Sequence, residues 1–301
     1  MLVRLVKEKP LGTVGGVIIL ILFLTGIFAN WIAPYGYNEM TSAARLSPPS
    51  QHFLLGTDHL GRDILSRIIY GARISVIIGV VGSTIAVIVS LAIALTSGYF
   101  GGKVDAAIQR FVDAWMCMPS LFILLTVMSI LGPGLIQILI VVGPFFGITQ
   151  SRIIRSAVIG VKENMYVDAA RAVGAPASRI IFRHIFPNVF STVIVLFTVN
   201  MGAVILTEST LSFLGFGIPP PTPAWGSMIS ESGARFLLLA PGMAFWPGMA
   251  LSIVVYGVNM LGDGLRDVLD PRLRGGLGRF GGVEKKRAKR REKAEKAQGS
   301  V

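Results

Sequence analysis

Five long stretches of this 301-residue chain contain no charged residue, and they restrict what the chain can fold into. The stretches cover residues 11–33, 74–102, 114–151, 185–207 and 236–262. A helix that crosses a membrane needs about 20 consecutive apolar residues, and each stretch meets that length. Charged residues make up only 15% of the chain, whereas soluble domains have roughly 25%. The sequence therefore predicts an all-α integral membrane protein.

The stretch at residues 114–151 is too long for one spanning helix. Its 38 residues would form a helix of about 57 Å, nearly twice the thickness of the hydrocarbon core. Gly132, Pro133 and Gly134 lie near its middle and form a strong turn signal. We therefore expect two helices joined by a tight hairpin. With this division the chain has six transmembrane helices, and both termini lie on the same side of the membrane.

The first stretch follows a basic start at Arg4, Lys7 and Lys9, as in a signal peptide. It is about 23 residues long, however, whereas the apolar part of a signal peptide has about 7–15. We therefore expect a first spanning helix that is retained. The chain then divides into a cytoplasmic N-terminus with this span (1–33), an extracytoplasmic segment (34–73), a core with five further spans (74–268) and a basic tail (269–301).

Lys and Arg residues are distributed unevenly along the chain, whose net charge is +12. With cytoplasmic termini, the segments that face the cytoplasm hold 23 of the 28 Lys and Arg residues. Cytoplasmic loops carry such an excess, so we expect this orientation. The tail from residue 283 holds eight of these residues, and we expect it to be disordered beside anionic membrane lipid. No base-reading module accompanies the tail, so we expect no nucleic-acid partner.

A polar segment at residues 162–187, which we call the elbow, lies on the expected cytoplasmic side. Its residues 164–173 suit an amphipathic helix with Asn164 as the N-cap. Asp168 and Arg171 are three residues apart on this helix, where opposite charges can pair. The apolar stripe of the helix consists of Met165, Ala169 and Val173, with Tyr166 and Ala170 beside it.

The second half of the elbow has the features of a turn followed by another helix. Gly174 stands where a helix commonly ends in a left-handed residue, and Pro176 suits the first position of the next helix. Arg179 and Arg183 are four residues apart on that helix, and like charges at this spacing repel. A partner with acidic groups, or water, would remove this repulsion. Pro187 marks the start of the next span.

Two short helices at a bend, joined directly to a spanning helix, can pass a movement from a soluble partner into the membrane. The alternative is a pair of interfacial helices that only anchors the loop. Both interpretations place the elbow at the cytoplasmic surface.

The extracytoplasmic segment carries a group of charged residues next to the second span. Asp58, Arg62, Asp63 and Arg67 are close in the sequence. Mutual pairing is the simplest interpretation, and an exposed pair contributes less than about 1 kcal/mol. The alternative is that Asp58, Arg62 and Asp63 dock an extracytoplasmic partner. Asp63 can also start a helix, since the apolar residues after it recur at helical spacing.

Three charged residues within or at the ends of spans need partners. Glu208 lies in the region of the fifth span, and carboxylates inside a membrane face protein or water. It can pair with Ser209, Thr210 or a basic group, or it can line a solute path together with Ser209. Our hypothesis is that Glu208 supports an outer gate. We expect Arg152 and Arg155 to snorkel to the headgroups, with a role in a gate as the alternative.

At the elbow the chain resembles the permease subunits of binding-protein-dependent ABC importers. A cytoplasmic loop of that family has Glu-Ala-Ala, three residues, Gly, nine residues and then Ile-x-Leu-Pro. Here Asp-Ala-Ala at 168–170 precedes Gly174 at the same spacing, and Ile-Phe-Pro at 185–187 closes the pattern. Asp168 replaces the Glu of the family and keeps its carboxylate on a shorter arm. Phe186 replaces Leu, and His184 stands where many members have Ile.

Other segments narrow the resemblance. Residues 55–75 and 207–229 are similar to those of the dipeptide/oligopeptide/nickel permease group, and residues 263–275 close the chain as the second, C-type permease of that group does. The resemblance covers nearly the whole chain, from the first span to about residue 274. It implies the type I importer fold, a helix bundle with alternating access and cytoplasmic coupling helices, in a bacterial or archaeal cell membrane.

The resemblance also implies partners. The permease would pair with a homologous B-type permease, two ATP-binding subunits and an extracytoplasmic substrate-binding protein, for which Asp58, Arg62 and Asp63 are docking candidates. The elbow would dock in a cleft of an ATP-binding subunit, which binds ATP and Mg. The residues implied at that contact are Tyr166, Asp168, Ala169, Ala170, Arg171, Gly174, Ala175, Arg179 and Arg183.

The expected function is the permease subunit of an ATP-driven importer of di- or oligopeptides. The chain has no G-x-x-x-x-G-K-[ST] phosphate loop, so we expect a non-catalytic subunit without a cofactor. Nickel or another small solute is an alternative cargo, but His52 and His59 are too few ligands to predict a metal site. An alternative of another class is a self-sufficient secondary transporter, which needs coupling-ion sites near the midplane, where charges are almost lacking.

Overall fold

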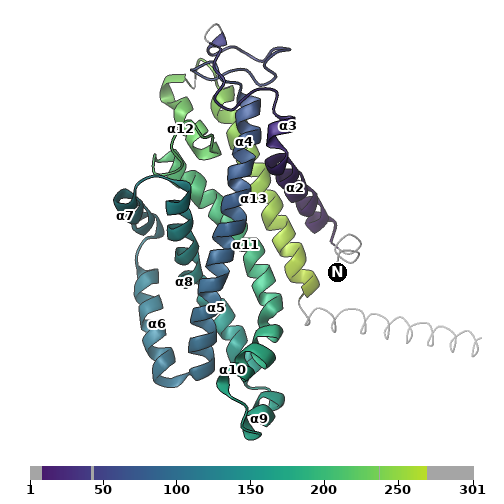
Figure 1. Ribbon diagram of the computed structural model, residues 1–301, viewed down its shortest axis with the longest axis vertical. Helices are drawn as coiled ribbons and strands as arrows, with labels where there is room; N and C mark the ends of the chain where they lie inside the picture. The colour runs from purple at the N-terminus through teal and green to yellow at the C-terminus, as the bar shows by residue number, and fades with distance from the viewer. Residues whose placement is uncertain (1–8, 42–43, 237, 270–301) are drawn as a thin grey trace, which may run out of the picture.

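Regular structure in this protein is almost entirely helical. The computed structural model describes residues 9–41, 44–236 and 238–269, which form an elongated helical bundle (Figure 1). Within these residues the regular elements are helices, apart from an isolated β-bridge between Thr57 and Asp63. The predicted all-α fold class is therefore confirmed. The basic start at Arg4 and Lys7 and the basic tail beyond residue 269 lie outside the described residues.

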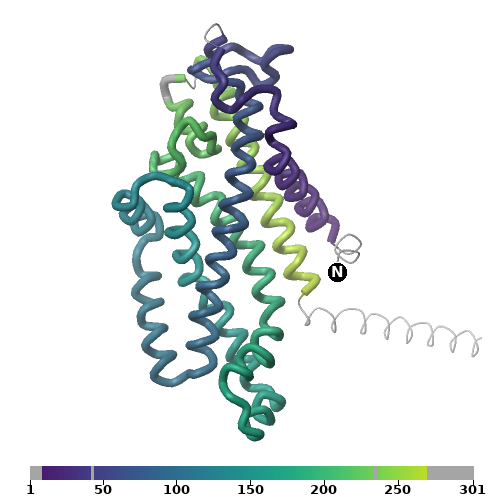
Figure 2. The backbone as a smooth tube through the Cα atoms, viewed as in Figure 1, coloured from purple at the N-terminus to yellow at the C-terminus, as the bar shows by residue number. Residues whose placement is uncertain are grey.

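Within the described residues, five continuous helices are long and apolar enough to cross a membrane. They are α2 (Pro10–Ile27), α4 to α5 (Ile64–Phe100), α8 (Leu135–Lys162), α10 to α11 (Ala177–Phe213) and α13 (Gly242–Leu269). The number rises to six when the bent pair of α6 and α7 counts as one span. The backbone tube in Figure 2 shows most of these helices running along the long axis of the molecule.

The individual elements include two π-helical turns inside long helices. One, η2, interrupts the helix of α4 and α5, and the other, η3, joins α10 to α11. The bounds are α3 (Ala29–Ile32), α4 (Ile64–Ile77), η2 (Ile78–Gly82), α5 (Ser83–Phe100), α6 (Gly102–Cys117), α7 (Ser120–Leu131), α9 (Met165–Ala172), α10 (Ala177–Arg179), η3 (Ile180–Ile185), α11 (Phe186–Phe213) and α12 (Trp225–Phe236).

The third span differs from the expectation. A helix already begins at Gly102, in a region expected to be a connector, and the chain bends by 89° between α6 and α7. Pro119 has no N–H and disfavours the helical conformation of the residue before it, and Met118 is accordingly extended, with φ −86° and ψ 137°. The predicted hairpin after α7 is confirmed, since Gly132 has a φ of 80° between α7 and α8.

Glycines allow neighbouring helices to approach closely. An added Cβ at Gly15 of α2 would lie 2.4 Å from the backbone oxygen of Gly257 on α13. An added Cβ at Gly147 of α8 would lie 2.7 Å from the backbone oxygen of Ala86 on α5. The backbones therefore pack directly against each other. Association of helices in membranes depends on such close van der Waals contact.

Ion pairs join α6 to α8. The guanidinium group of Arg155 binds the carboxylate of Asp105, with 2.6 Å between Nε and Oδ1. Arg152 pairs through Nη2 with Asp113 of α6. Both arginines, which we expected to snorkel to the headgroups, thus pair with acids of a neighbouring helix.

A second group of ion pairs lies at the end of the bundle opposite α9, where Figure 1 shows the 44–63 segment beside α12. Arg62 Nε lies 2.6 Å from Asp58 Oδ2, and Arg62 Nη2 lies 3.0 Å from Glu231 Oε2 of α12. Arg67 Nη2 of α4 lies 3.3 Å from the same Glu231 oxygen. Arg62 and Arg67 are 2% and 1% exposed. This buried network ties the 44–63 segment, α4 and α12 together.

We predict that Gly15→Ala destabilises the protein, because the added Cβ overlaps the backbone of α13. Overpacking of this kind costs about 1–3 kcal/mol and would lower the Tm of the purified protein in detergent. Gly16→Ala is the matched control, since the nearest atom to its Cβ would be 3.7 Å away. Equal melting temperatures for the two variants would contradict the direct packing of α2 on α13.

We predict that Arg67→Met destabilises the protein strongly, because it leaves the two acids Asp58 and Glu231 with Arg62 as their single cationic partner among the described residues. Breaking a buried ion pair costs about 3–5 kcal/mol. Arg110→Met removes the same charge from a side chain that is 87% exposed, and we expect a loss below about 1 kcal/mol. Thermal unfolding measures both losses, and a similar small loss for both variants would show that the network does not stabilise the fold.

Candidate functional site

The elbow ends the bundle as a compact bend, which Figure 1 shows around α9 and α10. Helix α9 ends at Ala172, and Gly174 follows its C-cap residue Val173 with a φ of 80°. The Ala175 N–H donates to the Ala170 carbonyl at 3.1 Å, and the Gly174 N–H donates to the Arg171 carbonyl at 3.0 Å. These two bonds form a Schellman motif. The prediction of a left-handed glycine at this position is confirmed.

Two details of the elbow differ from the sequence prediction. Asn164 occupies the N-cap position of α9, but its side chain makes no capping bond. Its amide instead donates to the carbonyls of Gly160 and Val161 at 3.2 and 2.9 Å, and so closes the end of α8. Pro176 precedes α10 as its N-cap and is not its first residue.

The second elbow helix continues into the membrane without a break. Residues 177–213 form one helix in which the π-helical turn η3 ends at Ile185, two residues before Pro187. A proline in a regular α-helix clashes with the carbonyl four residues earlier. The wider π-helical turn accommodates it here, with the Phe186 N–H donating to the carbonyl of Ile181. The part of the elbow from Ala177 onwards is therefore continuous with α11.

The buried contact of α9 is Val167, which the sequence analysis did not select. Val167 is 0% exposed and packs in one apolar cluster with Ile180, Ile185 and Val158. The expected stripe points the other way, since Met165 and Val173 are 87% and 88% exposed. The elbow therefore presents apolar side chains to its surroundings while Val167 fixes it to the bundle.

Most of the predicted docking residues lie together on the exposed surface of the elbow. Ala170 and Ala175 are half-buried against the apolar cluster around Val167. Arg171 binds Asp168 across one turn, at 3.0 Å. The exposed members are Tyr166, Asp168, Ala169, Arg171, Gly174, Arg179 and Arg183.

Asp58, Arg62 and Asp63 do not form the exposed patch that a docking role requires. Asp58 and Asp63 are 4% and 3% exposed. Asp58 and Arg62 belong to the buried ion-pair network, and Asp63 accepts hydrogen bonds from the N–H and hydroxyl of Ser66 at 2.8 and 2.6 Å as the N-cap of α4. The helix start at Asp63 is confirmed, whereas the exposed patch is corrected to a structural network.

The same region holds three potential metal ligands. Ligand atoms of Asp58, His59 and Glu231 lie within 4.8 Å of one another. Both carboxylates already accept charged hydrogen bonds from Arg62, and a divalent cation beside guanidinium groups would be repelled. We assign no metal to these residues.

Glu208 and Ser209 lie inside the protein rather than at a cavity wall. Glu208 of α11 is 1% exposed. Its carboxylate accepts hydrogen bonds from the hydroxyls of Ser212 at 2.6 Å and Ser209 at 3.3 Å. The structure therefore places Glu208 in the arrangement expected for structural pairing.

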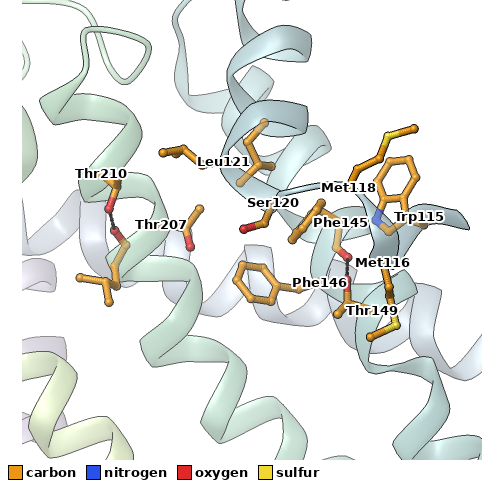
Figure 3. Close-up of a pocket in the computed structure, with 12 residues that line it drawn as sticks. Trp115, Met116, Met118, Ser120, Leu121, Phe145, Phe146, Thr149, Thr207 and Thr210 are labelled. Carbon is orange, nitrogen blue, oxygen red and sulfur yellow. Dashed lines mark hydrogen bonds between the residues drawn. The ribbon is translucent and has the colours of Figure 1, made fainter. Parts of the chain in front are cut away.

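A pocket of about 600 Å³ lies at the break between α6 and α7. Figure 3 shows Thr207 and Thr210 of α11 on one side, Trp115 and Met118 on the other, and Phe146 of α8 between them. The residues that line the pocket carry no charge. Sequence reasoning selected Glu208 on α11, but its neighbours Thr207 and Thr210 line the pocket. Pro119, which breaks the span between α6 and α7, is the sequence feature that could have indicated the pocket.

Comparisons with known proteins agree with these features. Residues 86–275 match the family model of the binding-protein-dependent transport system inner membrane component, and residues 3–49 match that of the N-terminal TM domain of oligopeptide transport permease C. The first model covers the elbow, the pocket and α11.

Relatives match over nearly the full length. The chain is 41% identical to the dipeptide transport system permease protein DppC of Alkalihalophilus pseudofirmus, over 89% of this chain and 88% of the relative. It is 37% identical to the oligopeptide transport system permease protein OppC of Bacillus subtilis, over 89% and 88%. It is 35% identical to the glutathione transport system permease protein GsiD of Escherichia coli, over 90% of each chain. The chain therefore belongs to the family of inner membrane components of binding-protein-dependent transport systems.

Proposed function

We propose that this chain is a permease subunit of an ATP-driven importer of di- or oligopeptides. The observation that carries the proposal is the exposed elbow, which is continuous with the long helix of α11. The names of the relatives, which refer to dipeptide, oligopeptide and glutathione transport, support a peptide as the cargo. Nickel and other small solutes have no comparable support here, and a self-sufficient secondary transporter would have no use for the elbow.

The proposed complex contains this chain, a homologous permease, two ATP-binding subunits and an extracytoplasmic substrate-binding protein. ATP and Mg are bound by the ATP-binding subunits, and this chain is non-catalytic. Both termini and the elbow lie in the cytoplasm, and the end with the buried ion-pair network lies outside. The orientation is supported by the excess of Lys and Arg in the segments on the elbow side.

The chemistry of the elbow surface supports a protein partner. Met165, Val173 and Phe182 are strongly exposed apolar side chains, next to the cationic Arg179 and Arg183. Exposed apolar residues rimmed by polar ones mark interaction sites. Acidic groups on an ATP-binding subunit would pair with the two arginines, and its apolar cleft would cover the three apolar side chains.

The mechanism follows from the continuity of the elbow with α11. Closure of the ATP-binding subunits around ATP moves the elbow, and α11 moves with it as one body. The spans turn from an inward-facing to an outward-facing arrangement, and the docked binding protein releases its peptide into the path. Hydrolysis of ATP then restores the inward-facing state. The binding protein selects the peptide before it reaches this chain.

We predict that Gly174→Val uncouples ATP hydrolysis from transport. A β-branched residue at a φ of 80° is strained by roughly 1–2 kcal/mol, and this strain would distort the turn between the elbow helices. An added Cβ meets no atom within 4 Å, so the effect comes from the backbone alone. The measurement is ATP-dependent peptide uptake by proteoliposomes that contain the whole complex.

Two variants control for the change at Gly174. Gly174→Asn tolerates the left-handed conformation and is expected to retain most of the uptake. Gly160→Val adds the same side chain within α8, where an added Cβ also meets no atom within 4 Å. Wild-type uptake by Gly174→Val, at normal expression, would refute a mechanical role for the turn.

We also propose that Glu208 supports an outer gate through its bonds to Ser209 and Ser212. Glu208→Gln keeps the size of the side chain but replaces one of its two acceptor oxygens by an amide NH2 group, so we predict intact assembly and uptake that falls severalfold. Assembly is checked by co-purification of the subunits, and uptake is compared with Glu39→Gln, which changes an exposed glutamate. Full uptake by Glu208→Gln at normal expression would contradict a role of Glu208 in an outer gate.

A further inference from the structure

Three threonine hydroxyl groups on the wall of the pocket between α6 and α7 donate their hydrogens to backbone carbonyls. Thr149 donates to the backbone carbonyl of Phe145 at 2.9 Å, and Thr207 and Thr210 donate to carbonyls four residues earlier at 2.8 Å each. Figure 3 draws two of these bonds, at Thr149 and Thr210. A hydroxyl has one hydrogen and two acceptor lone pairs. The three oxygens therefore remain as acceptors for a ligand.

Trp115, another lining residue of the pocket, carries a hydrogen-bond donor. Its indole Nε1 is buried and has no hydrogen-bond partner among the described residues, and an indole N–H can only donate. Buried polar groups are normally paired, so this donor needs an explanation. The indole ring packs against Phe145 of α8, with ring centroids 5.9 Å apart, and this contact holds it at the pocket wall.

The rest of the wall is apolar and without charge. Met118, Leu121 and Phe146 are among the lining residues. A charged group would find no partner there, and an unpaired charge is costly to take out of water. The volume of about 600 Å³ lies within the range of about 300–1,000 Å³ that is typical of small-molecule sites.

We propose that this pocket is a subsite of the translocation path that takes one uncharged, apolar side chain of a peptide together with the adjacent peptide bond. The peptide N–H donates to the hydroxyl oxygen of Thr207 or Thr210, and the peptide carbonyl accepts from Nε1 of Trp115 after a rotation of the indole ring that exposes this buried atom to the pocket. A peptide bond offers both groups at once, whereas a lipid chain uses neither. The inference rests on the proposed function and adds a selectivity that lies in this chain.

The first test changes the charge of the wall. Ser120→Asp places a carboxylate at the first residue of α7, where the helix dipole favours it. The probes are the dipeptides Ala-Leu, Ala-Lys and Ala-Glu, taken up by liposomes that contain the whole complex. We expect the uptake ratio of Ala-Lys to Ala-Glu to rise about fivefold over wild type. The same binding protein is used throughout, so its own preference cancels in the comparison.

Ser129→Asp is the matched control, because it introduces the same charge on α7 outside the pocket. We expect it to leave the ratio at the wild-type value. A ratio that changes equally in both variants would overturn the subsite, since the charge would then act through the general potential of the complex.

The second test removes one acceptor without changing the shape of the wall. Thr207→Val is expected to slow the uptake of Ala-Leu by about threefold to tenfold, the effect of one hydrogen bond. Thr84→Val is its control, because Thr84 of α5 also donates to the carbonyl four residues earlier, at 2.7 Å, and is exposed outside this pocket. This variant is expected to transport like wild type.

The outcomes separate the subsite from the proposed function. ATP-driven uptake by the wild-type complex, with an unchanged peptide ratio in Ser120→Asp and with Thr207→Val equal to Thr84→Val, would exclude the subsite and leave the importer function intact. The pocket would then be covered by lipid or by the partner permease. Absence of ATP-driven peptide uptake by the assembled wild-type complex would refute the proposed function, and the subsite with it.

Discussion

Backbone N–H and C=O groups in the hydrocarbon core of a membrane have no water to bond, so each needs a partner within the protein. A continuous helix meets this requirement, and an interruption is tolerated only where protein or water surrounds it. The interruptions in this chain are therefore informative. The break at residues 118–119 opens the pocket, and the turn at η3 joins the elbow to α11. The remaining spans are nearly uninterrupted and pack through glycines.

Features fixed by neighbouring residues could be predicted from the sequence. The hairpin at Gly132 follows from the conformational freedom of glycine beside proline. The turn at Gly174 and the helix start at Asp63 follow from the local chemistry of helix ends. Each of these signals acts within about one helical turn. The tertiary structure can move such a boundary by a residue, as at Pro176, but it does not remove it.

Features that depend on contacts between distant segments could not be predicted. Arg155 pairs with Asp105, which is 50 positions away in the sequence. Arg62 pairs with Glu231, which is 169 positions away. Without these partners the arginines had to be assigned to headgroups or to an exposed patch. For the same reason the burial of Val167 could not be predicted, since it depends on contacts with Ile180 and Ile185. In this protein, the bend of the elbow at Gly174 could be predicted from the sequence, whereas the exposed and buried faces of the elbow helices and the pocket could not.

The helix of residues 177–213, which is continuous through the π-helical turn η3, acts geometrically as a lever. Thirty residues separate Ala177 from Thr207, or roughly 45 Å at the helical rise. A tilt of one degree about the Ala177 end would shift Thr207 by roughly 0.8 Å at that length. Hydrogen bonds weaken steeply over distances of that size. An angular change of only a few degrees at the Ala177 end would thus be enough to make or break contacts at Thr207. Movement of the elbow and binding in the pocket would then be coupled through the length of this helix.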